Sequence, residues 1–95
     1  MYKFAKLFEV GESQLVVTKE WNEGVHQIVF RTVIDGEGLM LGANFGKEKE
    51  HHRHALLYLE SIDQVQAEEV IDYATKAIKG ELTGKESLIK DFYVH

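Results

Sequence analysis

The chain has 95 residues, and 11 Lys and Arg against 16 Asp and Glu give a formal net charge of −5. With 44% hydrophobic and 28% charged residues, it is too apolar for a disordered segment and too evenly charged for a membrane protein. The absence of cysteine excludes a disulfide framework, a thiolate zinc site and a cysteine nucleophile. Because nucleic-acid backbones are bound mainly by Lys and Arg, the acidic balance predicts no direct contact with nucleic acid.

The length and the N-terminus give two further expectations. A chain of 95 residues without a linker or repeat predicts a single domain over 1–95. The residues from Met1 to Lys6 carry no apolar signal segment, so we expect a cytoplasmic protein without membrane association.

The first half of the chain reads as strands separated by glycine-containing turns. Alternating apolar and polar residues predict strands over 3–10, 14–21, 25–34 and 39–45. Asp35-Gly36 is the clearest hairpin signal, because both central positions of such a turn take a positive φ. Gly42, inside a predicted strand, would suit a bulge or a close approach of another backbone.

Residues 47–61 fit two patterns. They are rich in helix formers, with apolar residues at helical spacing, whereas alternation through His52, His54 and Leu56 would suit a strand. We favour the helix and leave the strand as the alternative.

The next segment carries the clearest helix signal. Asp63 and Gln66 form a capping box ahead of apolar residues at three- and four-residue steps, which predicts an amphipathic helix that ends at Gly80. Beyond it, residues 83–92 could form a short helix, or residues 88–94 an edge strand.

These elements define an α+β fold. We expect an N-terminal antiparallel β-meander of four strands, or five, covered by one or two C-terminal helices in two layers. The opposite face of the sheet, to which we assign Trp21 and several valines, is expected to be only partly covered. Because such a face is commonly protected by a second copy, we expect a homodimer.

The densest group of potential metal ligands is Glu50-His51-His52-Arg53-His54. On a strand His52 and His54 share a face, and on a helix His51 and His54 lie one turn apart, so either structure places two ligands together. A catalytic metal needs a third. The predicted ligands are His51, His52, His54 and Glu60, with His26 and His95 as further candidates for the third position.

Gly46, His52, His54 and Glu60 occur in the order of the first cupin motif, which they resemble. The resemblance implies a β-barrel in which the His-x-His pair and the acid hold a metal, and it covers about fifteen residues. The acid lies one or two positions late, and a chain without proline lacks the proline-containing second motif. We therefore do not extend the cupin function to this chain, and we favour a solvated His and Glu run.

No catalytic residue is predicted, and no cofactor is expected. Trp21 and Tyr93 stand beside polar neighbours at the ends of elements, and since Trp and Tyr dominate interface hot spots, both are predicted interface anchors. The leading hypothesis is a small cytosolic, non-enzymatic binding or regulatory module that contacts another protein and works as a homodimer. The alternatives are a metal-binding protein or small metal-dependent enzyme, and an acidic nucleic-acid mimic or small-ligand sponge.

Overall fold

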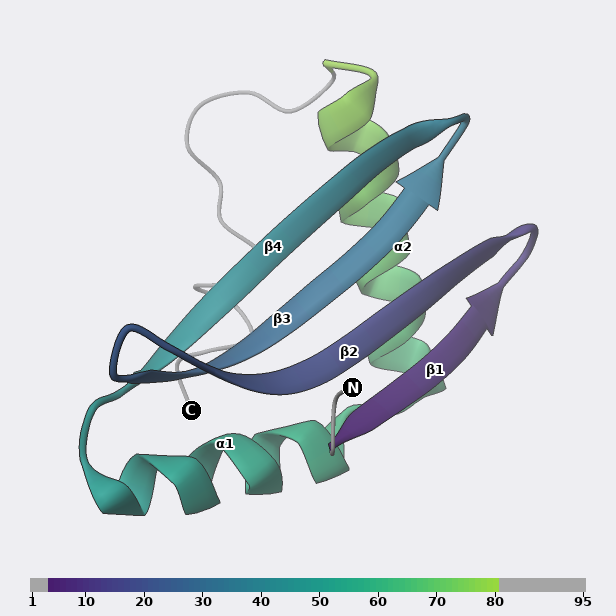
Figure 1. Ribbon diagram of the computed structural model, residues 1–95. Helices are drawn as coiled ribbons and strands as arrows, with labels where there is room; N and C mark the ends of the chain where they lie inside the picture. The colour runs from purple at the N-terminus through teal and green to yellow at the C-terminus, as the bar shows by residue number, and fades with distance from the viewer. Residues whose placement is uncertain (1–3, 81–95) are drawn as a thin grey trace.

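The computed structural model describes residues 4–80. They form four strands and then two helices: β1 (Ala5–Val10), β2 (Ser13–Asn22), β3 (Val25–Ile34), β4 (Glu37–Gly46), α1 (Lys49–Ser61) and α2 (Gln64–Ile78). The sheet is antiparallel in the order β1-β2-β3-β4, and both helices pack against one of its faces (Figure 1). The predicted α+β fold is confirmed. The proposed C-terminal helix or fifth strand lies outside the described residues.

Short hairpins fix the registers of the sheet. Glu23 and Gly24 have φ values of 51° and 79°, and Asp35 and Gly36 have φ values of 51° and 82°. Two consecutive positive φ values define the tight turn that matches the twist of antiparallel strands. Both turns follow from the sequence, because Gly adopts this conformation without steric cost.

Alternation along the strands places one set of side chains against the helices. Leu15 and Val17 of β2 and Ile28 and Phe30 of β3 are buried on this face. The helices contribute small and branched residues to the same core, namely Ala55, Leu59, Ala67, Val70, Ile71 and Ala74. The position of α2 therefore follows directly from its predicted apolar stripe.

Helix α1 settles the ambiguous segment in favour of the helix. Its first turn is fixed by the Glu48 amide, which donates to Nδ1 of His51 at 3.0 Å. At its other end, the Lys6 ammonium donates to the carbonyls of Glu60 and Ile62 at 2.8 and 3.0 Å. A cation at a helix C-terminus satisfies carbonyls that have no partner within the helix.

Helix α2 begins as predicted. The Gln66 amide donates to Oδ1 of Asp63 at 2.9 Å, and the Asp63 amide donates to Oε1 of Gln66 at 3.0 Å. No helix within residues 4–80 is long and apolar enough to cross a membrane.

The predicted bulge at Gly42 was wrong. Gly42 pairs regularly with Val29, and the register shift lies between His26 and Gln27, opposite the end of β4. There Gly46 has a φ of 133°, and the ring of His51 fills the space that a Cβ at Gly46 would need. The end of β4 therefore packs closely against α1 at Gly46, a contact that a pattern within one strand does not reveal.

We expect Gly46→Ala to lower the free energy of unfolding by about 1–3 kcal/mol, because the new Cβ meets the His51 ring and the backbone conformation disfavours a side chain. Gly24→Ala is the matched control, since Gly24 also has a positive φ but a Cβ at that position meets nothing within 4 Å. Urea unfolding of both variants tests this. Equal stability of the two variants would contradict the packing argument.

Candidate functional site

The sheet face turned away from the helices is the candidate site, and we call it the open face. Figure 1 views the molecule from this side, with α2 behind the strands. The open face carries Ala5, Leu7 and Glu9 of β1, Gln14, Val16, Thr18, Glu20 and Asn22 of β2, Val25, Gln27, Val29, Arg31 and Val33 of β3, and Gly38, Met40, Gly42 and Asn44 of β4.

Large apolar side chains are exposed at one end of the open face. Leu7 and Val33 are each 60% exposed, and Met40 is 65% exposed. Cross-strand pairing sets Leu7, Val16, Arg31 and Met40 side by side, and we call this set the Leu7 row. Single exposed apolar residues are ordinary, but a group on one uncovered face is typical of a contact surface.

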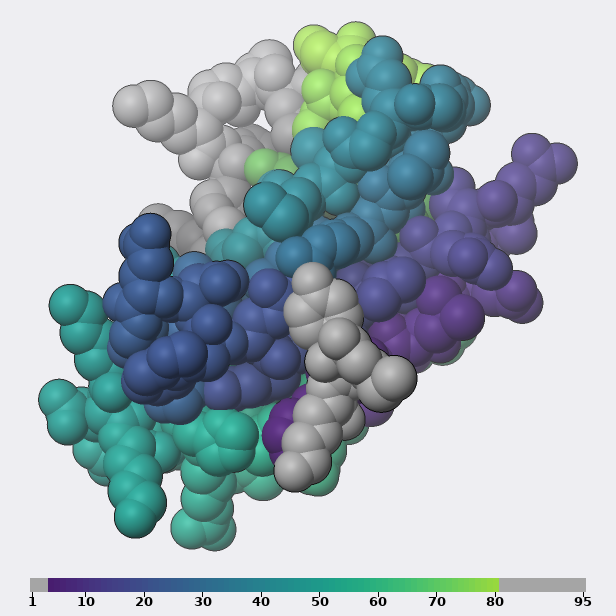
Figure 2. All heavy atoms as spheres, in the orientation of Figure 1, coloured from purple at the N-terminus to yellow at the C-terminus, as the bar shows by residue number. Residues whose placement is uncertain are grey.

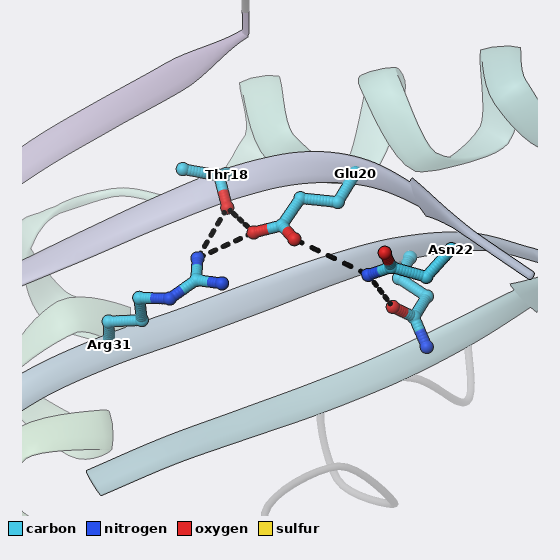
Figure 3. A network of polar contacts seen from close by, with 5 residues as sticks. Thr18, Glu20, Asn22 and Arg31 are labelled. Carbon is cyan, nitrogen blue, oxygen red and sulfur yellow. Dashed lines mark hydrogen bonds and ion pairs between the residues drawn. The ribbon is translucent and has the colours of Figure 1, made fainter. Parts of the chain in front are cut away.

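An ion pair occupies the centre of the open face. The Arg31 guanidinium donates to Oε2 of Glu20 at 2.5 Å and to Oγ1 of Thr18 at 3.2 Å, while the Thr18 hydroxyl donates to the same Glu20 oxygen at 2.6 Å (Figure 3). The hydrogen bond from Arg31 is the main cause that lowers the pKa of Glu20, so this carboxylate stays ionised.

Amide side chains extend this network across the sheet. The Asn22 amide donates to Oε1 of Glu20 at 3.4 Å and to Oε1 of Gln27 at 2.9 Å, and the Gln27 amide donates to Oδ1 of Asn44 at 2.6 Å. The polar groups of the open face are therefore bound largely to one another. Covering such a face removes less hydration than covering unpaired charges would, which lowers the cost of a contact.

A depression lies next to the Leu7 row. The pairing of β2 with β3 stops at Leu15 and Thr32, so the ends of the β1-β2 and β3-β4 hairpins diverge. Figure 2 shows these two hairpin ends standing apart. The fork between them holds a cavity of about 580 Å³ with Glu9, Gln14, Val16, Arg31 and Val33 among its lining. The open face thus combines exposed apolar side chains with a depression beside them.

The predicted metal ligands are distributed along α1. The rings of His51 and His54 lie 5.8 Å apart, and the ring of His52 lies 5.5 Å from that of His26. Glu60 follows His52 by eight residues of helix, which is about 12 Å along the axis. Among residues 4–80, no group of three or more His, Asp or Glu side chains is placed to share a metal ion. The structure does not support the resemblance to cupins, because His52, His54 and Glu60 fall on a helix and not on the strands of a barrel.

His26 and Lys19 form a buried polar pair between the sheet and α1. Lys19 is 9% exposed and His26 is 7% exposed, and Nζ of Lys19 lies 2.6 Å from Nδ1 of His26. Because an ammonium only donates, Nδ1 must accept, which requires a neutral imidazole. Burial lowers the pKa of both groups, and the charges of Lys19, His52 and His51 lower the pKa of His26 further.

An amine and an imidazole at hydrogen-bond distance are also a nucleophile and a base, the pairing used in covalent catalysis. In Lys19 and His26, however, both groups are more than 90% buried, so a substrate does not reach them. We assign the pair to the packing of α1 against the sheet.

Trp21 is not on the open face, and this part of the prediction was wrong. It follows Val17 and Lys19 at two-residue steps on the helix side, where its ring contacts that of His26 at 4.2 Å. It lies near the end of β2 and is 56% exposed, so it stays a predicted anchor. Tyr93, the second predicted anchor, lies outside the described residues.

Sequence reasoning missed Leu7, Met40 and the network around Arg31. A signal was present in β2, where Thr18, Glu20 and Asn22 recur at two-residue steps and indicate a polar stripe. Their partners on β3 and β4 could be found only with the cross-strand register.

Comparison with known proteins does not identify a relative, since no family model, curated protein or solved structure matches the chain.

We expect the free energy of unfolding to fall as the pH drops below about 6.5, the ordinary pKa of histidine. The pKa of His26 is lowered in the folded chain, so the unfolded chain takes up a proton at higher pH and acid favours unfolding. His26→Asn keeps an acceptor for Lys19 and removes the ring, so this variant should lose less stability on acidification. Urea unfolding at about pH 7.5 and about pH 5.5 measures the difference.

His54→Asn is the matched control, because it removes an exposed histidine of the same cluster. This variant should lose as much stability on acidification as the wild type does. If His26→Asn loses as much stability on acidification as the wild type does, buried His26 is not the source of the acid sensitivity.

Proposed function

We propose that this protein is a small, non-enzymatic binding module of the cytosol that works by protein–protein contact, and that the contact surface is the open face. The observation that carries the proposal is the exposure of Leu7, Val33 and Met40 on the face that neither helix of residues 4–80 covers. Removing apolar surface of this kind from water stabilises a contact by about 25 cal/mol per Å².

The internal pairing of the polar residues supports the same function. Burying an unpaired charge in a contact is costly, but Arg31 and Glu20 already neutralise each other. The depression between the two hairpin ends is large enough to receive a side chain of a partner. A module of this type needs a folded scaffold and one exposed apolar surface, and both features of residues 4–80 support the proposal.

The alternative of a metal-binding protein stays a prediction from the sequence. Elemental analysis of untagged protein, with thermal melts with and without a chelator, separates the two functions. The binding-module proposal expects no stoichiometric metal and no chelator-dependent change in Tm. A bound metal whose removal lowers Tm would support the metal-binding alternative.

We expect Leu7→Glu and Met40→Glu to weaken binding at least tenfold, or about 1.4 kcal/mol, because each places an unpaired charge in the contact. Binding is measured for any protein that co-purifies with the wild type, further copies of the chain included. Both residues are exposed, so the folds of the variants should survive, which circular dichroism checks.

Leu57→Glu is the matched control, because Leu57 is also apolar and 52% exposed but lies on α1, away from the open face. Binding that is lost equally in all three variants, or in none of them, would contradict the assignment of the contact to the open face.

A further inference from the structure

We propose that the open face binds the open face of a second copy of this chain, with the two-fold axis of the dimer between the two sheets and parallel to the strands, midway between β2 and β3. This inference rests on the proposed function, because it names the partner of the same surface. It is argued from cross-strand register, charge, the position of two glycines and the available area.

The direction of the axis decides which residues meet. Two sheets stacked face to face are related by a two-fold axis that lies in the plane between them, and the contact is isologous. An axis along the strands sets β1 over β4 and β2 over β3 of the other copy. In the Leu7 row, Leu7 then lies over Met40 of the second copy, and Met40 lies over Leu7. The contact between Leu7 and Met40 thus occurs twice in the dimer, and it covers two of the most exposed apolar side chains of each copy.

The charges on the open face select the same axis. With the axis along the strands, Arg31 faces Val16 of the second copy and Glu20 faces Gln27. An axis across the strands at the Leu7 row would instead set Arg31 against Arg31. Like charges opposed in a contact are unfavourable, so the axis along the strands is preferred.

Two glycines of β4 support the same arrangement of the dimer. A Cβ built at Gly38 or Gly42 meets nothing within 4 Å, and neither residue has the positive φ that would require glycine. Glycine inside a strand weakens it, and the packing within residues 4–80 does not explain either one. In the proposed dimer Gly42 lies over Ala5 of the second copy, so the missing side chain lets the two sheets approach closely.

The area of the open face is sufficient for a dimer. Four strands at about 4.8 Å spacing and up to ten residues at about 3.3 Å rise give a face of roughly 600 Å². Two such faces bury about 1,200 Å², the lower limit of a standard specific interface, before the relief of the side chains is added. Stacked sheets with strands aligned within about 30° are a common packing.

Cross-linking tests the arrangement, because the chain has no cysteine of its own. Leu7→Cys and Met40→Cys are prepared separately, mixed and treated with a short bifunctional thiol reagent. We expect a covalent dimer that joins one variant to the other and little dimer from either variant alone. Facing residues of two stacked sheets lie about 10 Å apart, which exceeds the Cα separation of about 7 Å that a disulfide allows but is within reach of the reagent. Two copies of residue 7 would be displaced by a further three strand spacings, or about 14 Å, across the strands.

The control is Leu57→Cys mixed with Met40→Cys, which should not cross-link faster than by random collision. Leu7→Cys that cross-links to itself as fast as to Met40→Cys would overturn the proposed axis. Gly42→Val gives a second readout. Its fold should be retained, because a Cβ at this position meets nothing within 4 Å, but the mass from light scattering should fall from twice 10.9 kDa toward 10.9 kDa.

Failure of this inference is distinguishable from failure of the proposed function. A monomeric wild type at about 100 µM, well above the Kd range of stable dimers, overturns the second copy as the partner. If that monomer retains a different protein that Met40→Glu loses, the open face is still a contact surface. If the monomer retains nothing that Met40→Glu loses, both proposals are overturned.

Discussion

Two helices cover one face of a four-stranded sheet, and the other face is left to solvent unless something else covers it. In this protein the helices meet the face that carries Leu15, Val17, Ile28 and Phe30. The second face therefore has to remain compatible with water in the free chain. It does so through the bonds among Arg31, Glu20 and their neighbours, while Leu7 and Met40 stay exposed. This division between the two faces explains both the stability of the fold and the proposed contact.

Much of the fold is predictable from local signals. The positive-φ turn at Asp35-Gly36 and the capping box at Asp63 depend only on neighbouring residues, and the structure has both. The segment that became α1 was harder, because its pattern suits two structures and its contacts with the sheet decide between them. Gly42 and Gly46 show the same limit. Only the structure shows that the fold itself requires Gly46, which lies beside the His51 ring and has a φ of 133°.

The candidate site was less predictable than the fold. A cluster of histidines drew attention in the sequence, yet His51 accepts a hydrogen bond at the start of α1 and His52 packs near His26. The network on the open face joins Arg31 to Glu20, eleven residues earlier, and Gln27 to Asn44, seventeen residues later. Such pairs depend on cross-strand register, which hydrophobic periodicity does not fix. Trp21 was assigned to the wrong face, because its two-residue steps from Val17 and Lys19 place it on the helix side of β2.

The most direct measurement of the central claim is the rate at which peroxide oxidises the Met40 thioether, followed by mass spectrometry over a range of protein concentrations. Met40 is 65% exposed in the free chain and lies inside the proposed contact. The account predicts that oxidation of Met40 slows as the concentration rises and the open faces become covered. A rate that stays constant from dilute to concentrated solution would show that this face remains in water, and would contradict the account.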